Sequence, residues 1–193
     1  LSKKLMPLVH LPVQSGSDKI LTAMNRKHNI NDFLEIYQKI KEKNSNIEFS
    51  SDFIVGYPGE NESDFKKTLD LIKVVKFINS FSFIFSPRPG TVASELKIID
   101  KKITSKRLDI IQKELFNYQI QKNKSLENNS INVLVENKMS ESPQYFGRSE
   151  YMTPVVFDAN DEDVGKIVKI RVNKSNRTTL FGEIIRNSTL RVA

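Results

Sequence analysis

The sequence contains no cysteine, and this absence limits the chemistry that the chain can perform by itself. It excludes a disulfide framework, a thiolate nucleophile, and Cys ligands for zinc or an iron–sulfur cluster. The two histidines, His10 and His28, are too few to build a metal site without several carboxylates. We therefore predict no metal ligands within this chain and assign none of its residues as catalytic.

Long apolar runs are also missing. No stretch of about eighteen apolar residues occurs, so we expect no membrane span, and no signal peptide is recognisable. The composition is 38% hydrophobic and 27% charged, which is ordinary for a soluble globular protein.

The net charge of +7 is the first positive indication. A basic chain attracts polyanions such as nucleic acid. One stretch, residues 166–182, has no acidic residue and carries five cations: Lys166, Lys169, Arg171, Lys174 and Arg177. They alternate with Ile167, Ile170 and Val172, so we expect the charges to share one face of a strand. A solvated strand face is the alternative, but contact with an RNA backbone is favoured.

The first part of the chain repeats one pattern three times. Each repeat is a β-rich run, a Gly-bearing turn and then a helical pattern; the runs are 7–13, 47–55 and 80–85. Strands separated by helices predict parallel βαβ units, whose active sites lie at the carboxyl ends of the strands. Three strands do not close a barrel, so more strands or another chain must complete the sheet.

The chain changes character near residue 129. Residues 104–128 read as one long helix, and five short β-rich runs follow it, which predicts a small antiparallel β-barrel. We therefore expect two domains, at 1–128 and 129–193. The apolar stripe expected for an earlier helix, starting near Asn31, is Phe33, Ile36, Tyr37 and Ile40.

The second β-rich run and the turn that follows it carry candidate site residues. In the turn from Gly56 to Glu60, glycine allows a ligand to approach the backbone closely, and Pro58-Gly59 fixes a tight turn. A nucleotide-like cofactor or a simple βα turn would both explain it. Asp52, in an otherwise apolar run, needs a partner if it is buried, either a ligand or an internal arginine.

Four further polar residues are candidates, three near strand ends and one at the end of a helix. Gln14 and Ser15 end the first run, where they could bond ribose hydroxyls, although spacing alone favours a helix cap. Arg26 ends the next helix, and Arg88 lies between two prolines in the third turn. Either guanidinium can hold a carboxylate or a phosphate through two hydrogen bonds.

Four motifs together resemble one family, the radical-SAM methylthiotransferases. In order they are His10-Leu-Pro-Val-Gln-Ser-Gly-Ser17, Met24-Asn-Arg26, Ser51-Asp-Phe-Ile-Val-Gly-Tyr-Pro-Gly-Glu60 and Ser82-Phe-Ile-Phe-Ser-Pro-Arg-Pro-Gly-Thr91. The β-rich tail is similar to the TRAM domain that ends those proteins. The resemblance implies an α/β fold, the C-terminal half of a radical-SAM (βα) partial barrel, followed by a TRAM-like barrel.

The same resemblance implies a reaction. A methylthio group would be added to C2 of N6-isopentenyladenosine next to the tRNA anticodon, using S-adenosylmethionine and [4Fe–4S] clusters. Implied partners are the tRNA anticodon stem-loop and a sulfur donor, and the implied location is the cytoplasm.

Residue roles follow by the same route. Gln14 and Ser15 would approach the ribose of S-adenosylmethionine, and Arg26 its carboxylate. The turn carrying Gly56, Gly59 and Glu60 would flank the adenine, with Asp52 nearby. Arg88 would face the substrate or the sulfur. The basic residues of the tail would grip the tRNA.

One departure from the family is large. The Cys-x-x-x-Cys-x-x-Cys loop lies upstream of this segment in the family and is absent here, so we expect the chain to need a missing N-terminal half and to be inactive alone. Two rival interpretations remain open. One is a non-catalytic RNA-binding remnant that uses only the tail. The other is an aldolase-like half-barrel that dimerises, but none of the three strand-end turns carries the lysine that it requires.

Overall fold

The computed structural model describes residues 5–186, and the chain divides into two compact units, residues 1–118 and 119–193. The division falls within helix α4 (Lys101–Ser125), earlier than the boundary after residue 128 expected from the sequence. The last turns of this helix belong to the second unit, because the Asn123 amide donates hydrogen bonds to the carbonyls of Asn176 and Arg177, at 2.9 and 3.1 Å.

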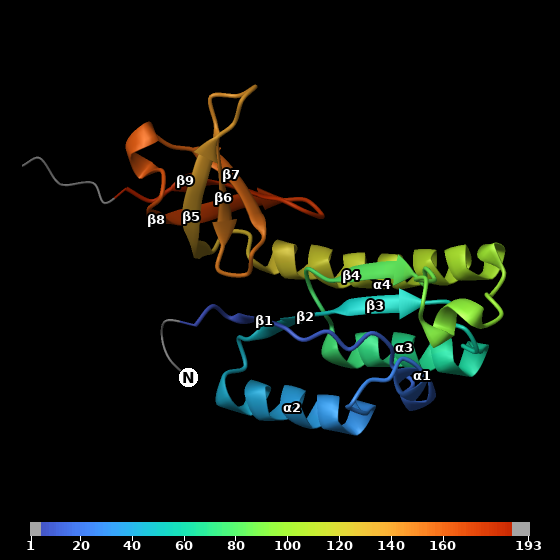
Figure 1. Cartoon of the computed structure of the whole chain (residues 1–193). Helices are drawn as coiled ribbons and strands as arrows, with labels where there is room; N and C mark the ends of the chain where they lie inside the picture. Colours follow the sequence, from blue (N-terminus) through green and yellow to red (C-terminus); the bar gives the residue numbers. More distant parts are fainter. Residues whose placement is uncertain (1–4, 187–193) are drawn as a thin grey trace, which may run out of the picture. The chain divides into compact units, whose positions relative to one another are not determined.

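The first unit contains short parallel strands, as the sequence predicts (Figure 1). Strand β1 (Leu8–His10) pairs with β2 (Glu48–Ser50), and β3 (Asp52–Val55) pairs with β4 (Phe81–Ile84). Only Ser51 separates β2 from β3, and a further parallel bridge joins Gln14 to Phe53. The pairings therefore form an interrupted parallel sheet whose carboxyl ends lie along one edge.

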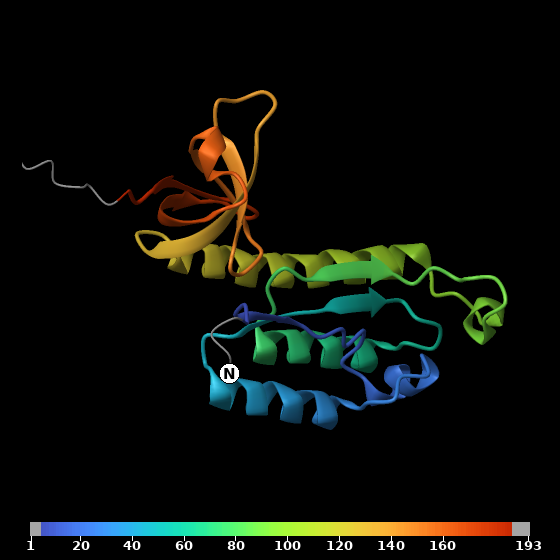
Figure 2. The same ribbon diagram turned by 60° about the vertical axis from the view of Figure 1, so that its left-hand side comes forward.

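Helices cover one face of these strands. They are α1 (Asp18–Ala23), α2 (Ile30–Lys43), α3 (Glu62–Val75) and the first turns of α4; in Figure 2, α2 and α3 run side by side along the strands. The core joins Phe49 and Phe53 of the strands to Phe65 of α3 and Ile111 of α4. Alternation along β3 sends Asp52 and Ile54 to the opposite face.

The ends of α2 and α3 follow from the sequence. Each begins at an asparagine, Asn29 or Asn61, that forms a capping box with the aspartate three residues later. The expected stripe of α2 is wrong at one position, because Ile36 is 46% exposed. Only Phe33, Tyr37 and Ile40 of the predicted apolar residues pack against the core. The buried side of α2 is therefore narrower than the sequence pattern predicted.

The second unit is a closed barrel with strand order β5-β6-β7-β9-β8 (Figure 1). Its strands are β5 (Ser130–Lys138), β6 (Tyr145–Ser149), β7 (Pro154–Asp158), β8 (Ile167–Ser175) and β9 (Leu180–Ile184). The predicted barrel is confirmed, with one difference: β7 and β9 are parallel. Strand direction cannot alternate all the way around a ring with an odd number of strands, so one pair must be parallel.

Candidate functional site

A cavity of about 850 Å³ opens at the carboxyl ends of the strands of the first unit. It gathers four residues that the sequence singled out, from four separate segments: Gln14, Arg26, Asp52 and Arg88. Apolar side chains complete its wall, among them Ile54, Tyr57, Phe83 and Phe85. A concave, mainly apolar wall with a few converging polar groups is typical of a small-molecule site.

The two arginines of the cavity are available for a ligand. Neither the Arg26 nor the Arg88 guanidinium bonds or pairs with any of residues 5–186. The Arg88 loop is nevertheless held in shape, because the Arg88 carbonyl accepts hydrogen bonds from the Thr91 N–H at 3.3 Å and hydroxyl at 2.8 Å. Two guanidiniums without partners in one cavity favour an anionic ligand.

Asp52 has a partner that the sequence analysis did not identify. Its Oδ2 lies 3.5 Å from Nε2 of His10, whose Nδ1 lies 2.6 Å from Ser50 Oγ. His10 and Ser50 stand opposite each other in the β1–β2 register. The Asp52 carboxylate is thus oriented by a histidine rather than by an arginine, and it still lines the cavity. The His10–Asp52 contact could have been predicted from the parallel pairing of the first two runs, which brings His10 next to the segment from Ser50 to Asp52.

Gln14 and Ser15 are adjacent but have different environments. Gln14 lines the cavity in a left-handed backbone conformation, with φ of 70°, which a non-glycine residue adopts at a cost of about 1–3 kcal/mol. Its carbonyl accepts from the Ile54 N–H at 2.9 Å. Ser15 is buried, and its hydroxyl accepts from the Ser17 N–H at 3.2 Å. Ser15 therefore shapes the turn and does not line the cavity.

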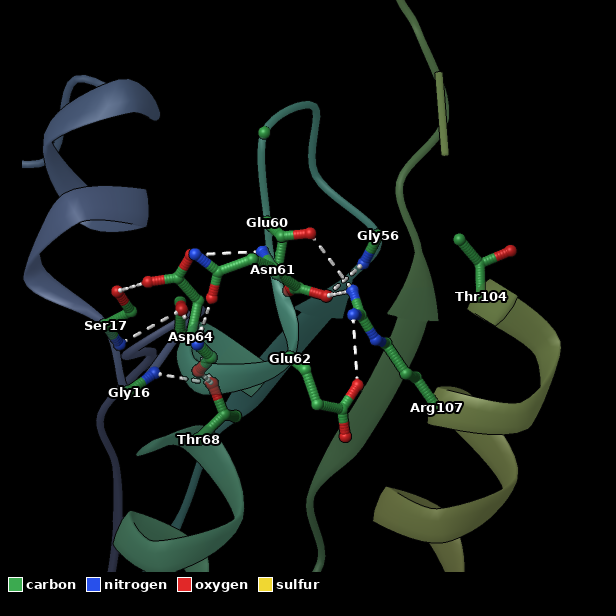
Figure 3. A network of polar contacts seen from close by, with 12 residues as sticks. Gly16, Ser17, Gly56, Glu60, Asn61, Glu62, Asp64, Thr68, Thr104 and Arg107 are labelled. Carbon is green, nitrogen blue, oxygen red and sulfur yellow. Dashed lines mark hydrogen bonds and ion pairs between the residues drawn. The ribbon is translucent and has the colours of Figure 1, made fainter. Parts of the chain in front are cut away.

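The turn from Gly56 to Glu60 is closed by Glu60 itself (Figure 3). Glu60 Oε1 accepts from the Gly56 N–H at 3.1 Å and pairs with Nη1 of Arg107, on α4, at 2.6 Å. Burial raises the pKa of Glu60, against the opposing effects of the Gly56 N–H and Arg107. Glu60 is 6% exposed, so it stabilises the turn from within and is not on the cavity wall.

Tyr57 is the side chain that this turn contributes to the cavity. Its hydroxyl donates to the Ala23 carbonyl at 2.8 Å, and its ring meets Phe85 edge-on, with centroids 5.0 Å apart. The hydrogen bond joins the turn after β3 to the end of α1, and so fixes the segment that leads to Arg26. The sequence analysis found neither Tyr57 nor Arg107, whereas Gly59, with open space around it, forms only part of the turn.

A second polar network holds α1 against α3 (Figure 3). Asp64 accepts from the Ser17 hydroxyl at 2.7 Å and pairs with Lys19 at 2.9 Å. Burial acts to raise the pKa of Asp64, but hydrogen bonds from the Asn61 N–H, Ser17 and Lys19 outweigh it and lower the pKa. Ser17 immediately precedes α1, but its hydroxyl donates to Asp64 instead of capping the helix. Gly16 is required here, since a Cβ would lie 2.5 Å from the Lys67 carbonyl oxygen.

The basic residues of the barrel lie on and around β8. Lys169 and Arg171 point outward, alternating with the inward Val168, Ile170 and Val172. The expected pattern is wrong at Ile167, which is 73% exposed and shares the outer face with the cations. A bulge between Val172 and Lys174 shifts the phase by one residue, and so keeps Lys174 outside.

The remaining two cations lie beside the strand rather than on it. Lys166 precedes β8, and Arg177 lies in the turn after it; both are exposed. The side chains of Lys169, Arg171 and Lys174 have no hydrogen-bond or ion-pair partner within the described part of the chain. These charges are therefore free to meet a polyanion.

Neither a membrane-spanning helix nor a metal site was found in residues 5–186. No helix there is both long and apolar enough to cross a membrane. No group of three or more His, Asp and Glu side chains is arranged to hold a metal ion in the same residues.

Family models match both units. Residues 1–72 match the radical SAM superfamily, and residues 124–185 match the TRAM domain. Between them they cover the strand-end turns around Gln14 and Gly56 and all five strands of the barrel.

Named relatives match along nearly the whole chain. The tRNA-2-methylthio-N(6)-dimethylallyladenosine synthase of Pelagibacter ubique (strain HTCC1062) is 60% identical over 192 residues, which is 100% of this chain and 43% of the relative. Proteins of the same name from Rickettsia akari (strain Hartford) and Wolbachia pipientis wMel are 44% and 43% identical, over 94% and 93% of this chain and 41% and 42% of their own lengths. The chain thus spans less than half the length of these curated relatives.

Proposed function

We propose, from the premise that residues 1–72 are a radical SAM segment and residues 124–185 a TRAM domain, that the chain is the C-terminal part of a tRNA methylthiotransferase. The proposed reaction adds a methylthio group to C2 of N6-isopentenyladenosine next to the anticodon. The observation that carries the proposal is the single cavity of the first unit that gathers Gln14, Arg26, Asp52 and Arg88.

The donor set of the cavity fits S-adenosylmethionine. The cofactor carries a carboxylate, a ribose diol and an adenine, and the cavity offers a guanidinium, a carboxylate beside an amide, and aromatic rings. When bound, S-adenosylmethionine supplies the methyl group and the 5′-deoxyadenosyl radical. The fit needs no movement of Arg26 or Arg88 away from another partner, because neither has one among residues 5–186.

Each side chain then has a binding role. Arg26 would hold the carboxylate of the cofactor through two hydrogen bonds. Gln14 and Asp52 would bond the ribose hydroxyls, with His10 holding the Asp52 carboxylate in place. Tyr57 would lie against the adenine, and the turn of Gly56, Gly59 and Glu60 would support it. Ser15 would act from behind, by shaping the turn that presents Gln14.

Arg88 would face the substrate rather than the cofactor. It stands in an exposed loop between Pro87 and Pro89, which restrict the backbone around it. A guanidinium there suits an RNA phosphate or the sulfur that is transferred. The TRAM domain would bind the stem-loop through the free cations of β8.

The iron–sulfur clusters do not fit this chain. Their ligands are thiolates, and the sequence contains no cysteine. No step through a cluster is assigned to these residues. The proposed enzyme therefore includes a further N-terminal part that holds the clusters, together with a sulfur donor, and works in the cytoplasm. A non-catalytic RNA-binding role is the second candidate, and the missing thiolates favour it if no such part exists.

Calorimetric titration of the chain with S-adenosylmethionine tests the proposed cavity. Binding is expected, and Arg26→Ala should weaken it at least about tenfold, since a charge-assisted hydrogen bond is worth roughly 1.5–3 kcal/mol. Lys27→Ala is the matched control, because Lys27 is the neighbouring cation but does not line the cavity. Equal effects of the two variants, or no binding, would count against the cofactor assignment.

A further inference from the structure

Two aliphatic side chains stand exposed next to each other on the outside of the barrel. Leu134 on β5 and Ile167 on β8 are 43% and 73% exposed. They are directly opposite in the antiparallel register of the two strands, so that their Cβ atoms lie about 4.5–5.5 Å apart. Both side chains point away from the interior of the closed barrel, so its core does not cover this pair.

The backbone beneath the pair is well fixed. The Val135 N–H donates to the Lys166 carbonyl at 3.0 Å, and the Gly165 N–H donates to the Val135 carbonyl at 2.9 Å. These bonds tie the end of the ladder next to Leu134 and Ile167. The pair is thus a preformed apolar platform, and a ligand that covers it would pay little to order it.

Cationic side chains lie on two sides of this platform. Along β8, Lys169 and Arg171 follow Ile167 on the same outer face, and neither has a side-chain partner within residues 5–186. Across β5, Arg148 stands opposite Leu134. Its charge is already met by Glu136 at 3.0 Å, so the free cations lie on the β8 side.

This combination suits a nucleotide better than a protein. Lysine is depleted in protein interfaces, and two apolar side chains make too small a patch for one. An RNA duplex hides the faces of its bases and displays hydroxyls and phosphates, whereas an unpaired nucleotide offers the face of a base with a phosphate on each side. Leucine and isoleucine do contact base faces in other nucleic-acid complexes, where they insert between base steps.

We propose that Leu134 and Ile167 form a platform for one unpaired RNA base, whose flanking phosphates meet Lys169 and Arg171. The inference rests on the proposed RNA-binding role of the barrel and adds the class of nucleic acid that this face selects. The cations supply affinity for any RNA, and the aliphatic pair supplies the preference for a single-stranded segment.

Fluorescence anisotropy of the full chain with two labelled RNAs tests this inference. One RNA is an unstructured single strand of about twelve nucleotides, in the range that a small barrel covers, and the other is a duplex of the same length. The test variants are Ile167→Thr and Leu134→Thr, because threonine keeps a high strand propensity and removes most of the apolar surface. Lys169→Gln is the matched charge variant, and Val74→Thr, at an aliphatic residue 59% exposed on α3, is the control.

The two kinds of variant should differ in a diagnostic way. Ile167→Thr should weaken single-strand binding about three- to fivefold and leave both duplex binding and the salt dependence unchanged. Lys169→Gln should weaken both RNAs and reduce the slope of log K against log salt by about 0.7–0.9. Circular dichroism spectra and melting temperatures equal to those of the unchanged chain show that the variants are folded.

Other outcomes distinguish the base platform from the general RNA-binding role of the barrel. If Ile167→Thr and Leu134→Thr behave like Val74→Thr, or weaken the duplex as much as the single strand, the platform is overturned while the RNA role stands. If Lys169→Gln also changes neither RNA, the RNA-binding role of this face falls with it.

Discussion

Arg107 and Glu60 form a buried ion pair across the first unit, with 2.6 Å between Nη1 and Oε1 and side chains only 8% and 2% exposed. The pair joins α4 to the turn that begins at Gly56 and presents Tyr57 to the cavity. Removal of the pair should therefore lower the free energy of unfolding, and it should weaken ligand binding only indirectly, through the turn.

Arg107→Met should lower the free energy of unfolding by about 3–5 kcal/mol, because it leaves the buried Glu60 carboxylate without its partner. Urea unfolding followed by circular dichroism measures this. The double variant Arg107→Met, Glu60→Leu should recover much of the loss, since two apolar side chains can replace a buried pair. A single variant as stable as the unchanged chain would mean that the pair contributes little.

The same variant should show an altered pH dependence. Burial raises the pKa of Glu60, and without Arg107 one of the opposing effects is gone. A carboxyl group whose pKa is higher in the folded state binds its proton more tightly there. The deficit of Arg107→Met should thus shrink as pH falls through the pKa of Glu60 and grow as pH rises. A deficit that is constant between pH 4 and 8 would contradict this.

Asp64 should make the folded state less stable at low pH, which is the opposite of the effect of Glu60. Its pKa is lowered in the folded state by the Asn61 N–H, Ser17 and Lys19, despite its burial. The stability that it supplies is present above the pKa of an unfolded aspartate, about 4, and is lost as pH falls through the folded-state value. Asp64→Asn should remove that part of the acid dependence, measured by urea unfolding at several pH values. Asp70→Asn, at an exposed residue of the same helix, should not.

In the barrel, Tyr145 should ionise late. Its hydrogen bond to Asp161, helped by burial, raises its pKa to about 12. The neutral phenol supports the folded state below pH 10, the ordinary value, and this support is lost as pH rises through the folded pKa. Absorbance titration of the phenolate should show the latest transition moving to lower pH in Asp161→Asn and not in Asp158→Asn. An unmoved transition would show that Asp161 is not the cause.

The strands and helices could be predicted because each has a regular pattern of its own. Alternation located the strands of the barrel, and apolar residues spaced at three and four located α2. The predictions that were wrong concern whether a side chain points to the core or to solvent. Ile36 and Ile167 fit an apolar pattern yet are exposed, because the width of a buried face is set by the elements that pack on it. The parallel β7–β9 pair follows from ring closure, which no local pattern contains.

The sequence predicted some of the residues of the candidate site, and the others depend on contacts between distant segments. The strand-end turns could be expected to meet, and Gln14 and Arg88 from two of them line one cavity with Asp52 of β3 and Arg26, which follows α1. Within the Gly56–Glu60 turn, the sequence could not say that Tyr57 would point to the cavity and Glu60 away from it. That choice depends on Arg107, which is 47 residues further along the chain.

Exchange into a relative tests the central claim most directly. This chain would replace the segment of the Pelagibacter ubique synthase that it matches at 60% identity, in a host that lacks its own methylthio-forming enzyme. Mass spectrometry of tRNA nucleosides would then measure 2-methylthio-N6-isopentenyladenosine. The account predicts that the modified nucleoside appears with the exchanged chain and disappears with Arg26→Ala. A chimera that folds and holds its clusters but makes no modified nucleoside would contradict it.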